Sequence, residues 1–120
     1  MINLDLSMVR GDTRIIDCTV KGVDGTTPYD LTSCTLTFTA KRQITDADGV
    51  ATFQLTNGAG ITITDAPGGL FEIEITPAST YSMTAGATLV CDIQLKDVNA
   101  RVFTLGKGTL AVSEDVTRAS

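Results

Sequence analysis

Leu89-Val-Cys-Asp-Ile-Gln-Leu-Lys96 is the stretch that decides the fold, because an apolar residue occupies every second position from Leu89 to Leu95. Alternation with a period of two is typical of a β-strand that buries one face. The same pattern occurs in two other segments of the chain. We expect the buried faces of these strands to form the core, with the residues Ile16, Cys18, Val20, Phe71, Ile73, Ile75, Leu89, Cys91, Ile93 and Leu95.

Short segments of this kind recur along the chain, separated by clusters of Gly, Asp, Asn and Pro. The predicted strands are Ile2 to Leu6, Arg14 to Val20, Cys34 to Lys41, Ala51 to Leu55, Ile61 to Thr64, Leu70 to Ile75, Leu89 to Lys96, Arg101 to Leu105 and Thr109 to Val112. The predicted turns are Asp24-Gly25, Asp48-Gly49, Asn57-Gly58, Pro67-Gly68-Gly69 and Val98-Asn99-Ala100. Pro77 to Met83 is expected to form a single helical turn. The pattern predicts an all-β antiparallel sandwich or barrel.

The length of 120 residues suits one domain, which we place over residues 1–120. No apolar run approaches the ~20 residues that a membrane-spanning helix requires, so no membrane partner is expected. The N-terminus lacks the basic region and apolar block of a secretory signal, which predicts an intracellular origin. The net charge of −5 comes from residues spread along the chain, and this disfavours nucleic acid as a partner.

The chain contains no histidine, which is the commonest general base and a frequent metal ligand. A lysine could activate a serine or cysteine nucleophile, but no lysine here stands beside a nucleophile motif. The sequence therefore predicts a protein that is not an enzyme and that needs no cofactor or metal.

Three short motifs have both a functional and a structural interpretation. Glu72 and Glu74 share a strand face and could be paired carboxylates, but that face is opposite the apolar one and is expected to be solvated. The segment 46–49, Asp-Ala-Asp-Gly, resembles the start of a calcium loop without its later ligands, so a surface turn is favoured. The segment 10–12, Arg-Gly-Asp, spells an adhesion motif, but its glycine is expected to serve a turn.

The three cysteines are Cys18, Cys34 and Cys91, and each lies in a strand-like run. We expect them to be reduced and buried, because a free cysteine behaves as a small apolar residue. A disulfide between Cys18 and Cys91 across a sandwich is the alternative, although no tryptophan is present to pack on it.

Several longer stretches together resemble a family of small bacteriophage and prophage proteins. These stretches are Leu4 to Thr13, Tyr29 to Thr32, Leu36 to Lys41, Gly69 to Pro77, Cys91 to Leu95, Gly106 to Val112 and Asp115 to Arg118. The family is similar to the immunoglobulin-like N-terminal domain of phage baseplate upper proteins, which attaches receptor-binding machinery to the tail. The resemblance implies an immunoglobulin-like antiparallel β-sandwich of about seven to nine short strands.

The resemblance also implies a function and partners. It predicts a virion structural or assembly module of the tail, baseplate or connector, made in the bacterial host cytoplasm, with other phage structural proteins and a homo-oligomer as its partners. The chain ends at Ser120 without a coiled coil or receptor-binding tip, so a free-standing connector fits as well as a linker does. A module that binds carbohydrate or a cell surface is the alternative. The residues expected on the interaction surface are Tyr29, Asp30, Asp46, Asp48, Tyr81, Asp115 and Arg118.

Overall fold

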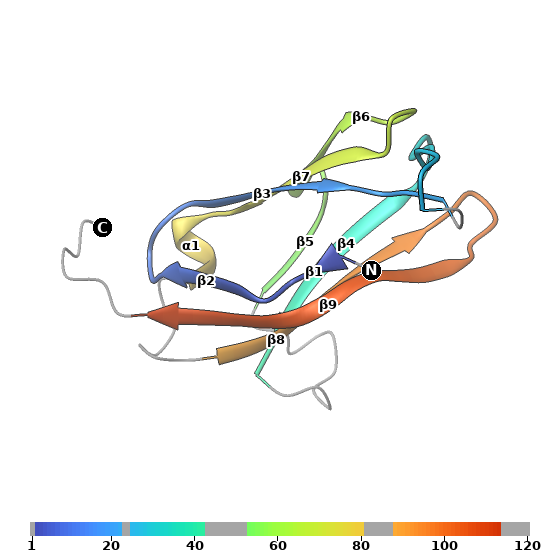
Figure 1. The fold of residues 1–120 in the computed structure, drawn as a ribbon. Helices are drawn as coiled ribbons and strands as arrows, with labels where there is room; N and C mark the ends of the chain where they lie inside the picture. Colours follow the sequence, from blue (N-terminus) through green and yellow to red (C-terminus); the bar gives the residue numbers. More distant parts are fainter. Residues whose placement is uncertain (1, 23–24, 43–52, 81–87, 114–120) are drawn as a thin grey trace.

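A computed structural model describes residues 2–22, 25–42, 53–80 and 88–113 of the chain. These residues form nine strands and one short helix, shown in Figure 1. The elements are β1 (Ile2–Asn3), β2 (Leu6–Val9), β3 (Arg14–Thr19), β4 (Thr35–Lys41), β5 (Phe53–Asn57), β6 (Gly60–Asp65), β7 (Leu70–Ile75), α1 (Pro77–Thr80), β8 (Thr88–Lys96) and β9 (Val102–Ser113). The prediction of an all-β fold is confirmed.

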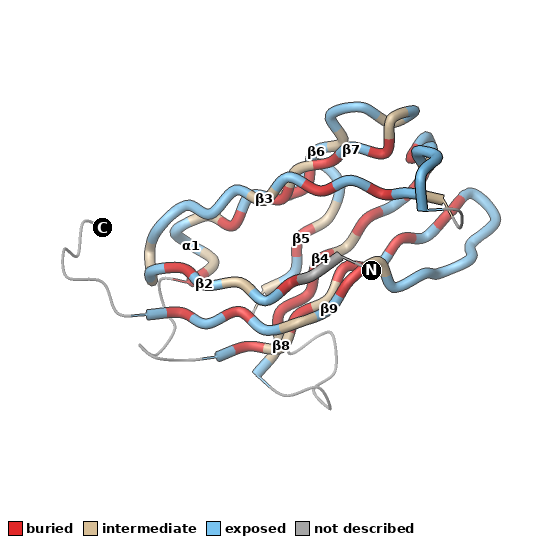
Figure 2. The backbone as a smooth tube through the Cα atoms, in the orientation of Figure 1, coloured by how far each residue is buried: buried red, intermediate tan, exposed pale blue. Residues whose placement is uncertain are grey.

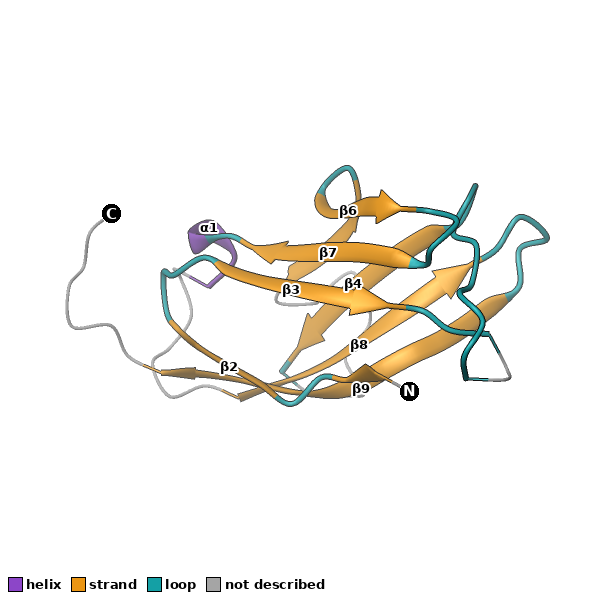
Figure 3. Cartoon of the chain, turned by 45° about the horizontal axis from the view of Figure 1, so that its top comes forward, coloured by secondary structure: helices purple, strands orange, loops and turns teal. Residues whose placement is uncertain are grey.

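The strands form one mixed sheet in the order β1-β9-β8-β4-β5-β6-β7-β3, with β2 also paired to β9. The sheet curls over on itself, so that β3, β7 and β6 lie opposite β4, β8 and β9 (Figures 1 and 3). The result is a nearly closed, barrel-like shape. Among the described strands, its seam lies between β3 and the β1/β2 edge, which form the two ends of the sheet.

The N-terminal strands correct the expectation of a wholly antiparallel sheet. Both β1 and β2 pair with β9 in parallel, Ile2 opposite Gly106 and Leu6 opposite Leu110. The two pairings share one register, so β1 and β2 are a single interrupted strand, and nine strands fill eight positions of the sheet. A second, short parallel contact joins β5 to β6.

The described part of β9 is one long strand, where the sequence predicted two strands separated at Gly106-Lys107-Gly108. Glycine is needed at position 108 because the N-terminal segment lies very close. A Cβ atom on Gly108 would stand 2.5 Å from the carbonyl carbon of Leu4. Glycine at 108 therefore permits the backbone contact that attaches the N-terminus to the sheet.

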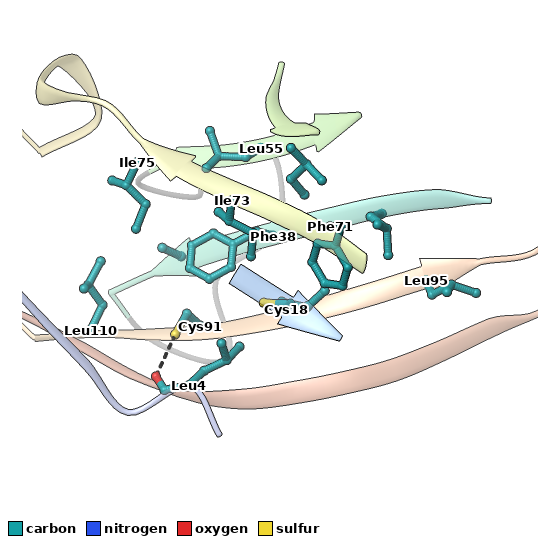
Figure 4. Close-up of a cluster of buried hydrophobic side chains, with 14 of the residues drawn as sticks. Leu4, Cys18, Phe38, Leu55, Phe71, Ile73, Ile75, Cys91, Leu95 and Leu110 are labelled. Carbon is teal, nitrogen blue, oxygen red and sulfur yellow. Dashed lines mark hydrogen bonds between the residues drawn. The ribbon is translucent and has the colours of Figure 1, made fainter. Parts of the chain in front are cut away.

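The core lies between the two halves of the sheet, and buried positions alternate along the strands (Figures 2 and 4). Nine of the ten expected core residues are buried; Ile16 is half-buried and packs against the others. Phe38 is fully buried, with its ring centroid 5.9 Å from that of Phe53. Sequence alternation did not identify three further buried core residues, Leu4, Leu31 and Leu110.

The expected turns and helix are largely confirmed where the structure describes them. Gly58 and Gly69 adopt positive φ angles of 79° and 71° in their predicted turns. Helix α1 occupies Pro77–Thr80, and the remainder of the predicted helical turn lies outside the described residues, as do Asp24 and the turn at Asp48. Thr80 is buried, and its Oγ1 accepts a hydrogen bond from the Gly11 amide at 3.0 Å.

Candidate interaction surface

The β8–β9 hairpin turns around one buried carboxylate. Asp97 accepts hydrogen bonds from the amides of Asn99 and Arg101, each at 2.9 Å, and from Arg101 Nε at 2.8 Å. Ala100 has a positive φ of 62°, a conformation that a residue other than glycine adopts at a cost. The bonds to Asp97 hold the turn in this shape, and the hairpin is therefore well defined.

Exposed apolar side chains gather at the end of this hairpin. Val98 is 67% exposed, Val102 56% and Phe103 44%. The Arg101 guanidinium lies over the Phe103 ring, 5.9 Å from its centroid. Figure 2 shows this end of β8 and β9 as a largely exposed stretch. Aromatic and arginine side chains are enriched at protein interfaces, so this cluster is a candidate contact surface.

A hollow of ≈ 550 Å³ lies beside the hairpin, between β9 and the end of β3. Thr104 and Leu105 line one side of it, and Thr19–Gly22 with Gly25 line the other. The hollow follows from the topology. Strand β3 is at one end of the sheet, and β1 covers β9 only from Gly106 onward, so no described strand fills the space between them.

A second hollow of ≈ 480 Å³ lies where β4, β8 and β9 meet. Its lining includes Thr39, Lys41, Asp92 and Lys107. Lys41 and Asp92 each already take part in an interaction within the chain. Within the described segments, no three His, Cys, Asp or Glu side chains are grouped so as to hold a metal ion.

Of the seven residues predicted for the interaction surface, two are described. Tyr29 is half-buried and packs against the core, and Asp30 is exposed and accepts hydrogen bonds from the Thr32 amide and hydroxyl. Burial, with Cys34 and Asp97 nearby, raises the pKa of Tyr29. Asp46, Asp48, Tyr81, Asp115 and Arg118 lie outside the described residues, as does the calcium-like segment 46–49.

Sequence reasoning missed the hairpin cluster. Val102 and Phe103 were assigned to a strand, and a strand residue is not expected to be a free contact residue. The signal was the run of consecutive apolar and β-branched residues from Val102 to Leu105, which does not alternate. A bulge next to Gln94 leaves Leu105 as an extra residue on β9 and changes which side chains face the core.

The remaining motifs have structural roles where they are described. Gly11 of the Arg-Gly-Asp segment has a φ of 83° in the turn between β2 and β3. Glu74 is exposed and Glu72 half-exposed, on the face of β7 opposite the buried Phe71 and Ile73. This confirms the solvated face that the alternation predicted.

The three cysteines are free and buried. The Cys91 thiol donates a hydrogen bond to the carbonyl oxygen of Leu4 at 3.6 Å, drawn in Figure 4. Burial and the charge of Asp17 raise the pKa of Cys18 to about 11. Burial, with Asp92 and Asp5 adding to it, raises the pKa of Cys91 to about 11.

Both Cys18 and Cys91 are therefore expected to resist alkylation in the folded protein. A thiol with a pKa of about 11 carries about 100-fold less thiolate than one at 9.0, and the thiolate is the reactive form. Iodoacetamide at pH 8, followed by mass spectrometry, should modify them only after urea is added. Rapid modification of either residue without denaturant would contradict the buried positions.

Asp97 should make stability depend on pH. Burial raises the pKa of this carboxyl, but the hydrogen bonds from Arg101 and Asn99 outweigh burial and hold the pKa below its ordinary value. A carboxyl whose pKa is lower in the folded state stabilises the fold above its unfolded pKa of about 3.9. That contribution is lost as the pH falls through the folded pKa.

The matched variant for this effect is Asp97→Asn, whose side chain has nearly the same shape as that of aspartate but cannot ionise. In urea unfolding at pH 6, the variant should have a lower free energy of unfolding than the wild type. The difference between the two free energies should become smaller as the pH is lowered to 2.5. Asp30, whose pKa the Thr32 hydrogen bonds lower, is common to both proteins and cancels from the comparison. A gap that stays constant with pH would refute the role of the Asp97 charge.

A scan against protein-family models found no match for this chain, and a search of curated proteins found none. The one described helix is far too short to cross a membrane. The functional interpretation therefore depends on the geometry of the site and on the sequence resemblance.

Proposed function

We propose that this chain is a non-enzymatic structural module of a bacteriophage particle, a tail, baseplate or connector component that works through protein–protein contacts. The observation that carries the proposal is the exposed apolar end of the β8–β9 hairpin, Val98, Val102 and Phe103, held in place by the Asp97 turn. A rigid, protruding apolar surface suits a contact with another protein. The sequence resemblance to phage baseplate proteins supplies the biological setting.

The finer fold assignment that accompanies this proposal is an immunoglobulin-like sandwich. The order β9-β8-β4 on one side and β6-β7-β3 on the other corresponds to strands G-F-C and D-E-B of that fold. The buried Cys18 on β3 and Cys91 on β8 then occupy strands B and F, which carry the inter-sheet disulfide of antibody domains. Here the two thiols are free, as expected for a reduced compartment.

Deletion of the gene from the phage genome tests the proposal. Loss of a structural module should leave particles that lack a tail part or fail to assemble, visible by electron microscopy. Complementation with the wild-type chain should restore them, whereas the double variant Val102→Ser, Phe103→Ser should not, although it should fold because both side chains are exposed. Normal, infectious particles from the deletion strain would contradict the proposal.

A further inference from the structure

We propose that the free edge of β9 at Val102–Leu105 is a strand-addition site, which binds an extended segment of a partner protein with alternating apolar and acidic side chains. This inference rests on the proposed function and names the surface through which the module would hold its partner. Three observations at one end of the molecule carry it: backbone groups that pair with no described residue, exposed apolar side chains beside a hollow, and a local excess of positive charge.

The backbone groups of this edge are placed by the hairpin register. The Asp97 amide donates to the Arg101 carbonyl at 2.9 Å, and Lys96 lies opposite Val102. Hydrogen-bonded and non-hydrogen-bonded pairs alternate in an antiparallel ladder, so the amides and carbonyls of Val102 and Thr104 point away from β8. On that side, β1 begins only at Ile2, opposite Gly106, and no described residue pairs with Val102–Leu105.

The side chains beside this edge offer apolar contacts to an added strand. Phe103 lies opposite the buried Leu95 and so faces the same side of the sheet, yet it is 44% exposed. Leu105 packs partly against the core and lines the hollow of ≈ 550 Å³. A strand laid along β9 would fill this hollow, and every second side chain would contact Phe103 and Leu105.

The charges around the edge specify the polar side chains of the partner segment. Residues 96–105 carry Lys96 and Arg101 but one carboxylate, Asp97, which is buried and bonded to Arg101, so that Lys96 is the uncompensated charge of this segment. Lys21 borders the hollow from the other side. This basic end contrasts with the net charge of −5 for the whole chain, and it is complementary to an acidic segment.

The test uses a blocked heptapeptide of alternating Glu and Val, with the Lys and Val heptapeptide as its charge control. Titration into the labelled full chain should shift and protect the amide signals of Val102 and Thr104 for the acidic peptide, and the basic peptide should bind about tenfold more weakly or not at all. Absence of binding by the acidic peptide, or signal changes confined to the β3 edge, would overturn the proposal.

Two variants at one position separate the backbone contact from the side chain. Thr104→Pro removes the outward amide without touching the β8 ladder, whereas Thr104→Ala keeps that amide. We expect about a tenfold loss of affinity for the proline variant and little change for alanine. Equal affinity of both variants would overturn the proposal. If circular dichroism shows that Thr104→Pro does not fold, Phe103→Glu is used in its place. Unchanged affinity of Phe103→Glu for the acidic peptide would also overturn the proposal.

Light scattering on the free chain tests whether the β9 edge instead binds a second copy of this chain. A concentration-dependent dimer that Thr104→Pro abolishes would assign the β9 edge to a second copy and overturn the acidic partner. Failure of the proposed function itself would appear separately, as infectious particles from the deletion strain. Defective deletion particles together with no peptide binding would reject this surface alone.

Discussion

Replacing Phe38 by alanine is expected to lower the free energy of unfolding by about 3–5 kcal/mol, the usual cost of removing a buried aromatic ring. Phe38 has no exposed surface, stacks on Phe53 and lies on β4, whose neighbours are β5 and β8. The cavity would open between the two halves of the sheet, where the surrounding strands cannot collapse to fill it. Urea unfolding followed by circular dichroism measures the loss.

The control for this prediction is Phe103→Ala, which removes the same ring from a partly exposed position on β9. Its effect on stability should be about 1 kcal/mol or less, because much of the ring already contacts water. Similar losses for the two variants would mean that the core is not centred where the structure places it.

Adding a single methyl group at Gly108 should cost about 3 kcal/mol, at the upper end of the range for overpacking. The new Cβ of Gly108→Ala would lie 2.5 Å from the Leu4 carbonyl carbon and 2.6 Å from its oxygen. Both atoms belong to the backbone, so no side-chain rotation can relieve the clash. The N-terminal strand must move away from β9, and the buried Leu4 side chain moves with it.

Hydrogen exchange should locate this loss in the amides that join β2 to β9, with those of β7 less affected. Ala111→Val is the matched control, because it adds bulk to an exposed position of the same strand and should change stability by about 0.5 kcal/mol or less. Unaltered stability of Gly108→Ala would show that the N-terminus is not packed against β9 as described.

The features that sequence alone could predict are local ones. Alternation identified the buried faces of β7 and β8, since each side chain needs only its own strand to decide which way it points. The turn at Asn57-Gly58 followed from the positive φ angle that glycine tolerates. Pro77 began α1 as expected, because proline suits the first position of a helix.

The features that sequence could not predict depend on distant segments. The parallel pairing of β1 and β2 with β9 joins residues 104 positions apart. The sequence predicts separate strands that end at Leu105 and begin at Thr109, whereas the structure has one strand in which Gly108 admits the Leu4 backbone. The exposure of Phe103 depends on how far the opposite half of the sheet extends, which no pattern within β9 encodes.

The candidate surface likewise has one part that the sequence predicted and one part that it did not. Two of the predicted contact residues, Tyr29 and Asp30, lie in the loop before β4, where the backbone amide of Tyr29 donates a hydrogen bond to the Val20 carbonyl oxygen. The sequence predicts Val98 in a turn and Val102 and Phe103 in a strand, and apolar strand residues are normally expected to be buried. An apolar residue that a fold leaves exposed is therefore informative only once the fold is known.

The central claim is that this chain is a structural part of a phage particle, and quantitative mass spectrometry of purified particles tests it most directly. Particles from the host that encodes the chain should contain it at a fixed, whole-number ratio to another tail or baseplate protein, and the ratio should survive a density gradient and a high-salt wash. Absence of the chain from intact, infectious particles would contradict the account.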